Sequence, residues 1–201
     1  MAQLPDLDLW LLEPKAERLT YPYCVWSMLE ALEAREAEAG RKADWLFWVE
    51  DDIAPLPDVY AKLRAAADPV ERPYMAALAY CRTQPYWPGV ARRQWHAEQG
   101  LMEIAQWPKA PAEGVWPVDQ VGMCAALIHR SLLGRVAPPQ FNVVPNQSGA
   151  MGPDAFWSMR LKQIGVYPHV CCDVEVEHLV SVLPVGRELS EAYNEAQRHA
   201  Q

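Results

Sequence analysis

The sequence predicts an α/β protein, in which helices flank a sheet within a single compact domain. Apolar runs that end in acidic or turn residues alternate with segments of helical period, which is typical of strands and helices interleaved around a sheet. The length of 201 residues and the apolar fraction of 51% suit one domain with an ordinary core. No internal repeat or low-complexity tract divides the chain, so we expect one unit over residues 1–201.

The first half of the chain predicts three strands and two helices. Strands are expected where short apolar runs end in acidic, proline or turn residues, and helices where apolar residues recur at helical spacing, as from Val25 to Leu32. Gly40 and the pair Asp68-Pro69 end the two helices. The expected elements are a strand at residues 7–12, a helix from Pro22 to Gly40, a buried strand at 45–49, a helix after Pro57 and a strand at 74–80.

The second half adds two long loops that we expect to border the active site. Prolines interleave with tryptophans over residues 82–117, which indicates a long loop or an irregular hairpin over the sheet. Residues 138–152 form a second loop, and loops of this length are usually functional. The other expected elements are a strand at 118–128, a short helix at 131–136, a helix at 154–165, strands at 167–172 and 174–178, and a polar helix at 188–198.

Charge and cysteine content limit the classes of function. The net charge of −8 argues against a protein that coats nucleic acid or anionic lipid. The 5 cysteines are odd in number, contain no C-x-x-C motif and mostly fall in apolar runs, which favours buried free thiols in a reducing compartment. The chain shows neither a transmembrane segment nor a signal peptide, so we expect a cytoplasmic protein.

Three carboxylates follow the predicted strand at residues 45–49. Glu50, Asp51 and Asp52 repel one another at the end of an apolar strand unless a positive charge lies there, and a divalent cation is the simplest candidate. In an extended chain Glu50 and Asp52 face the same side, at the edge where open α/β sheets bind ligands. The alternative is a solvated acidic loop that caps the next helix.

Other candidate residues lie further along the chain. His178 ends a short strand and offers an imidazole, which coordinates transition metals such as manganese, although a lone histidine is more often structural. Asp154 begins a helix, where an aspartate stabilises the first turn in any protein. Asp119, near Gly122, can meet a donor or acceptor sugar or serve a strand edge. Arg82, Arg92 and Arg93 are candidates for pairing phosphate, although arginines of this kind are more often solvated surface residues.

Four segments carry a resemblance to a known family, and they are Trp45–Asp58, Val118–Arg130, Gly152–Gly165 and Val176–Leu179. Taken in order, they resemble the inverting, family-two type of glycosyltransferases with the GT-A fold. In that family an apolar strand ends in a D-x-D-like motif, and a glycine-containing strand, an acidic pair that opens a helix and a strand ending in histidine follow. The resemblance implies a GT-A-like (Rossmann-like) mixed sheet flanked by helices.

The resemblance implies a role for each matched residue. Asp52, supported by Glu50 and joined by His178, would bind Mn²⁺ or Mg²⁺, which clamps the diphosphate of a UDP- or GDP-sugar. Asp154 would be the general base that takes the proton from the acceptor hydroxyl. The residues expected to contact the nucleotide-sugar donor are Asp51, Asp119 and Gly122.

The sequence departs from the family at two places. Pro153 stands where the family usually has a glutamate before the catalytic aspartate, which affects the orientation of the acceptor. Residues 1–49 form a shortened donor-binding part, because the family usually places nearly twice as much chain before the acidic motif. The base of the donor then needs a reduced pocket or a second subunit, which leaves a homo-oligomer open.

The function predicted from these features is transfer of a sugar, with inversion, from a nucleotide-diphosphate donor to a hydroxyl of a glycan, a lipid-linked acceptor or a protein. No nucleic-acid binding is expected. One alternative is a non-catalytic binding or structural module that retains a degenerate GT-A fold. Another is a nucleotidyltransferase, which ranks third because such enzymes usually carry a glycine-rich loop near the N-terminus, and residues 7–23 contain no glycine.

Overall fold

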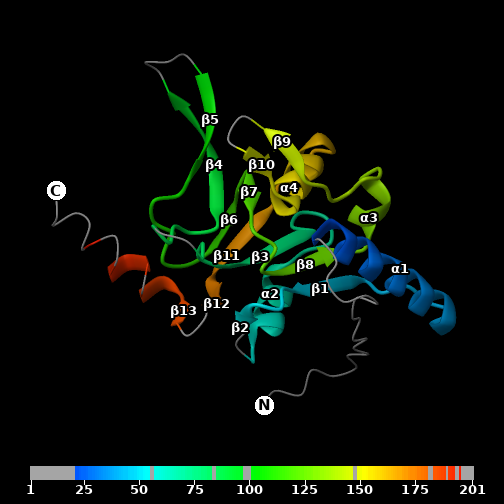
Figure 1. Cartoon of the computed structure of the whole chain (residues 1–201). Helices are drawn as coiled ribbons and strands as arrows, with labels where there is room; N and C mark the ends of the chain where they lie inside the picture. Colours follow the sequence, from blue (N-terminus) through cyan, green and yellow to red (C-terminus); the bar gives the residue numbers. More distant parts are fainter. Residues whose placement is uncertain are drawn as a thin grey trace.

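A five-stranded mixed sheet forms the centre of the molecule in a computed structural model, which describes residues 21–54, 57–82, 85–96, 101–146, 149–180, 183–188, 190–192 and 195 (Figure 1). Its strand order is β1-β8-β3-β11-β6, and only β3 and β11 are parallel neighbours. The strands are β1 (Trp45–Val49), β3 (Tyr74–Leu78), β6 (Val115–Pro117), β8 (Ala125–His129) and β11 (His169–Glu175). The predicted α/β class, with a mixed sheet flanked by helices, is confirmed.

Helices lie on both faces of this sheet, with α2 on the face opposite α3 and α4 in Figure 1. Successive side chains of β3 point to opposite faces, as pleating requires, and both sets are fully buried. Tyr74 packs in one core with Trp157 of α4, whereas Met75 packs in the other with Leu63 of α2. Within the described residues, the helices with bounds are α1 (Tyr21–Ala39), α2 (Val59–Ala66), α3 (Ser131–Arg135) and α4 (Pro153–Gln163).

Three smaller sheets lie around the central one in the part of the chain that the structure describes. The hairpin of β4 and β5 projects away from the central sheet in Figure 1, and β7 pairs with the near end of β4. A second sheet has the order β13-β12-β2, and β9 and β10 form a separate hairpin. Their bounds are β2 (Ile53–Ala54), β4 (Val90–His96), β5 (Leu101–Gln106), β7 (Gln120–Val121), β9 (Val144–Asn146), β10 (Gly149–Met151), β12 (Glu177–Val180) and β13 (Leu183–Val185).

The structure corrects several predicted elements. The strand at 118–128 is two strands, because the chain leaves one sheet after β7 and enters another at β8. The described residues of the segment 82–117 include the antiparallel pair of β4 and β5, followed by β6, and the loop 138–152 contains β9 and β10. The strand at 45–49 lies at the sheet edge and is partly exposed, with Val49 37% accessible. The predicted strand at 7–12 lies outside the described residues, as does much of the helix at 188–198.

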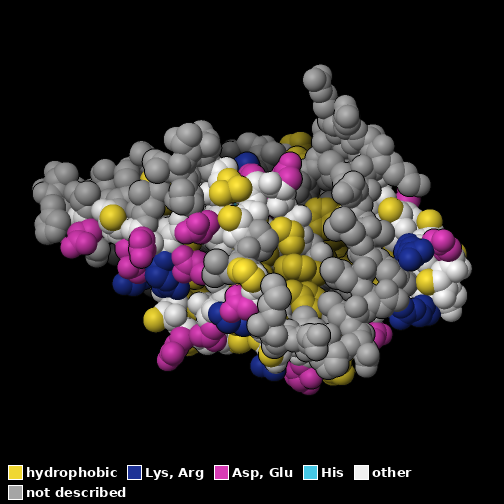
Figure 2. Space-filling view, turned by 90° about the horizontal axis from the view of Figure 1, so that it is seen from below, with side chains coloured by type: hydrophobic (Ala, Val, Ile, Leu, Met, Phe, Trp, Pro, Cys, Tyr) yellow, Lys and Arg dark blue, Asp and Glu magenta, His cyan; other side chains and the backbone are white. Residues whose placement is uncertain are grey.

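The described surface carries charged side chains of both signs, and most of the described cysteines are buried. Figure 2 shows acidic and basic side chains around a group of hydrophobic ones on one face. Cys124, Cys171 and Cys172 are buried free thiols, as predicted, whereas Cys81 is a partly buried one; the side chain of Cys24 lies outside the described ones. None of the helices within the described part of the chain has the length and apolar character needed to cross a membrane.

Candidate metal centre

The directions of the strands place the ends of three of them, β1, β3 and β8, side by side at one end of the central sheet. β8 runs antiparallel to both β1 and β3, so its amino end lies beside their carboxyl ends. Glu50 directly follows β1, and Cys124 directly precedes β8. The Glu50 N–H donates to the Cys124 carbonyl at 3.0 Å, which extends the β1–β8 ladder by one step. Glu50 and Cys124 are therefore held opposite each other by the backbone.

His178 reaches the same edge through the small sheet that contains β12. β12 pairs with β2, and His178 lies opposite Ile53, three residues after Glu50. The Leu179 N–H also donates to the Asp52 carbonyl at 2.7 Å. These backbone contacts hold β12 against the turn that follows β1. The His178 imidazole therefore lies at the same end of the central sheet as Glu50.

Glu50, Cys124 and His178 form a cluster of ligand-type side chains. Each contributes one ligand atom, and these three atoms lie within 4.8 Å of one another. The Cys124 Sγ and the His178 Nε2 are 3.4 Å apart, and both residues are buried. The His178 Nδ1 is hydrogen-bonded to the Tyr80 carbonyl, which can only accept, so Nδ1 carries the proton. The other ring nitrogen, Nε2, faces the Cys124 sulfur.

Asp52, predicted as the leading metal ligand, does not join this cluster. Its Oδ2 instead accepts a hydrogen bond from the Arg82 Nη1 at 2.6 Å, in an ion pair. The expectation that Glu50 and Asp52 share one side assumed an extended chain. The chain turns here, and the Ile53 N–H donates to the Glu50 carbonyl at 3.2 Å, so the alternation of an extended strand ends at Glu50. Asp51 lies exposed on the same turn.

Asp154 lies on the first turn of α4, beside the cluster. Its Oδ1 accepts a hydrogen bond from the Ala155 N–H at 2.8 Å. A β-carbon built on Gly122 would lie 3.4 Å from the Cys124 Sγ and 3.9 Å from the Asp154 Oδ2, so both side chains flank this glycine. The predicted base and Gly122 are thus neighbours of Cys124.

Burial and negative charge shift the pKa values of these groups. Burial raises the pKa of the Asp154 carboxyl above its ordinary value, against the hydrogen bond from Ala155. Burial also raises the pKa of the Cys124 thiol strongly, and the nearby charges of Glu50 and Asp154 add to this effect. Without a bound cation, the site therefore favours protonated forms of both groups.

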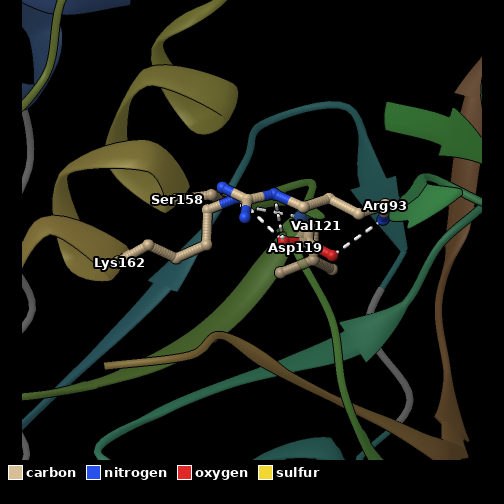
Figure 3. A network of polar contacts seen from close by, with 5 residues as sticks. All are labelled: Arg93, Asp119, Val121, Ser158 and Lys162. Atoms are coloured by element: carbon tan, nitrogen blue, oxygen red, sulfur yellow. Dashed lines mark hydrogen bonds and ion pairs between the residues drawn. The ribbon is translucent and has the colours of Figure 1, made fainter. Parts of the chain in front are cut away.

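Asp119 takes part in a separate network, shown in Figure 3. Its carboxylate pairs with the Lys162 Nζ at 3.0 Å and accepts from the Arg93 backbone N–H at 2.8 Å. Burial acts to raise the pKa of Asp119, but the hydrogen bonds from Arg93 and Lys162 outweigh it and lower this pKa. These residues line a depression of about 390 Å³, which also includes Ala155, the neighbour of Asp154.

The donor set decides which ions fit the cluster. A carboxylate and a neutral imidazole suit many divalent ions, whereas a cysteine sulfur suits zinc and similar soft or borderline ions. Mg²⁺ prefers oxygen ligands in octahedral arrangement, and the cluster offers oxygen from Glu50 alone. The residues fit a divalent ion, but they fit Mg²⁺ poorly. Manganese stays a prediction.

Sequence reasoning missed Cys124 as a member of the site. Cysteine in an apolar run resembles a small hydrophobic residue, and Cys124 directly precedes such a run. The available signal was its position at the start of a strand. If that strand pairs antiparallel with the one that ends at Glu50, the two residues must meet.

The fold is similar to that in a solved structure entitled "Crystal Structure of A197 from STIV". The two chains share 14% sequence identity with a TM-score of 0.54, over 82% of this chain and 70% of A197. No family model matches the chain, and no curated protein matches it. At this level of identity the similarity concerns the α/β architecture alone.

Proposed function

We propose that this chain is a metal-dependent glycosyltransferase, which transfers a sugar with inversion from a nucleotide-diphosphate donor to a hydroxyl acceptor. One observation supports it most. Glu50, Asp154 and His178 belong to separate segments of the sequence, and the resemblance to GT-A glycosyltransferases assigns them to one site. In the fold, Glu50 and His178 have ligand atoms within 4.8 Å, and Asp154 flanks Gly122 beside Cys124.

Each side chain of the site suits one task of the proposed reaction. A divalent ion at the cluster would neutralise charge that develops on a leaving diphosphate. Glu50 and His178 would hold that ion. Arg82, which pairs with Asp52 yet is 62% exposed, has a guanidinium that suits a phosphate oxygen. Arg82 would thus bring a positive charge to the proposed leaving-group side of the site, where Glu50, Asp51 and Asp52 otherwise place carboxylates.

Asp154 suits the role of general base. The acceptor hydroxyl is a poor nucleophile until it loses its proton, and a positioned carboxylate contributes about 10²–10⁴-fold to the rate. Burial raises the pKa of Asp154, which strengthens it as a base at neutral pH. The depression lined by Ala155, Met159 and Lys162 adjoins this residue on α4 and is the proposed acceptor pocket.

Binding experiments test the donor half of this proposal. We expect UDP or GDP, and at least one corresponding nucleotide sugar, to raise the melting temperature only when a divalent ion is present. Mn²⁺, Zn²⁺, Co²⁺ and Mg²⁺ should be screened in parallel against EDTA. If calorimetry shows no ion-dependent binding of any nucleoside diphosphate, the donor half is wrong and a non-catalytic module becomes the better interpretation.

Mutation of Asp154 tests the catalytic half. We expect Asp154→Asn to lower the transfer rate by about 10²–10⁴-fold and to leave the affinity for the nucleotide nearly unchanged. Glu71→Gln, at an exposed carboxylate away from the cluster, is the matched control and should keep the wild-type rate. An unchanged rate in Asp154→Asn would remove the base assignment without affecting the donor site.

A further inference from the structure

We infer that the Glu50–Cys124–His178 cluster binds a thiophilic divalent ion of the zinc class, with the Cys124 sulfur as a thiolate ligand, in place of the Mg²⁺ or Mn²⁺ expected from the sequence. The inference deepens the proposed function, because it names the ion of the proposed donor site. It stands on the geometry of the three side chains and is tested without any nucleotide.

The chemistry of the three donor atoms supports a zinc-class ion. Sulfur, imidazole nitrogen and carboxylate oxygen are the three atom types that bind Zn²⁺ in proteins. All three come from residues that the fold has already placed within 4.8 Å. Catalytic zinc sites usually have three protein ligands, with water or substrate as the next ligand, and the cluster supplies three side chains of the right types.

The hydrogen bond of His178 prepares its ring for this role. Histidine ligands of metals commonly donate their second ring N–H to a carbonyl or carboxylate, which fixes the tautomer and the orientation of the ring. His178 does this through Nδ1 and the Tyr80 carbonyl, and Tyr80 is itself buried. The remaining nitrogen, Nε2, is directed at the Cys124 sulfur.

Asp52 supplies a second argument, because it is the oxygen ligand that a harder ion needs. Its carboxylate is paired with Arg82 at 2.6 Å and lies outside the cluster. The site thus replaces an expected oxygen donor with the sulfur of Cys124. This exchange moves the preference from hard ions toward borderline ones.

A metal-free pair is the competing explanation for the short distance between Cys124 and His178. A thiol that donates to the imidazole nitrogen also gives a separation of 3.4 Å. The two explanations differ in one measurable property. Only a bound ion creates a direct bond between the Cys124 sulfur and a metal.

Cobalt titration of the full chain, first stripped with a chelator, distinguishes them. We expect one equivalent of Co²⁺ to produce a near-ultraviolet sulfur-to-cobalt charge-transfer band, which Zn²⁺ abolishes and a large excess of Mg²⁺ leaves unchanged. In Cys124→Ser the band should disappear and the affinity for Zn²⁺ should fall at least tenfold. Cys81→Ser, at the partly buried thiol, is the control and should keep the band.

Two results would overturn the inference: a titration of the wild-type chain without a charge-transfer band, or a band that persists in Cys124→Ser. The wild-type titration and the Mg²⁺ competition remain decisive even if the serine variant fails to fold. Failure of the proposed function looks different. In that case cobalt binds through Cys124, but no nucleoside diphosphate binds to the loaded protein.

Discussion

Replacement of Gly152 by alanine should disable Asp154 while the fold stays intact. Gly152 is the N-cap of α4, and a β-carbon there would lie 2.8 Å from the Asp154 Oδ1. That oxygen already accepts the Ala155 N–H, so the carboxylate must rotate and weaken this hydrogen bond. The backbone of Gly152, at φ −67° and ψ 167°, suits alanine, so no backbone strain is added.

The size of the effect follows from the displacement of the carboxylate. A shift of about 1 Å in a catalytic group costs on the order of 10²-fold in rate. We therefore expect Gly152→Ala to lower the transfer rate about 100-fold, with only a small change in melting temperature and with cobalt binding retained.

Gly134→Ala in α3 is the matched control for this experiment. Its new methyl group meets nothing within 4 Å, and alanine favours the helix by up to about 1 kcal/mol. The control should melt at or above the wild-type temperature and turn over normally. A Gly152→Ala protein with the wild-type rate would refute the claim that the position of this carboxylate matters.

Three further predictions concern stability. Because burial raises the pKa of Asp154, its charged form destabilises the fold above that pKa. Asp154→Asn should therefore have a higher free energy of unfolding than the wild type at pH 7, and the difference should vanish as the pH falls below 3.8, where the carboxyl is protonated in both the folded and the unfolded state. Glu36 pairs with Arg130 through two hydrogen bonds of 2.9 and 3.0 Å, so Glu36→Gln should cost about 3 kcal/mol in urea unfolding at pH 7. Arg130 lowers the pKa of Glu36, so the ion pair stabilises the fold fully above pH 4.5, and this stabilisation is lost as the pH falls. If acid lowered the stability of Glu36→Gln as much as that of the wild type, the assignment would be wrong. Leu63→Ala, at a fully buried position of α2, should lower the free energy of unfolding by about 2–5 kcal/mol in the same assay.

Elements with a strong periodic pattern were predictable from the sequence, and the pairing between them was not. The helix that ends at Gly40 and the strand that begins at Tyr74 lie where helical spacing and an apolar run place them. The break near Gly122 escaped detection, because an almost continuous apolar run hides the point where the chain passes from one sheet to another. The pattern of apolar residues along the sequence does not show which neighbouring strand a residue will pair with.

The same limit explains what was missed in the site. Glu50 and His178 were candidates by residue type and by their places at strand ends, and the resemblance to GT-A glycosyltransferases assigned both to one metal site. The fold brings the two residues together. Asp52 was assigned by an extended-chain rule at the point where the chain turns. Cys124 became visible as a partner only through the register of β1 against β8.

The order of strands in the central sheet has a consequence for how the protein reaches its native state. No two neighbours in β1-β8-β3-β11-β6 are consecutive in the chain, so every pairing closes a long loop before it gains any contact. Chains dominated by such distant pairings fold slowly, on the scale of milliseconds to seconds or longer. The β4–β5 hairpin and the helices can form early from local contacts, whereas the edge that carries Glu50, Cys124 and His178 is completed only when the last long loops close.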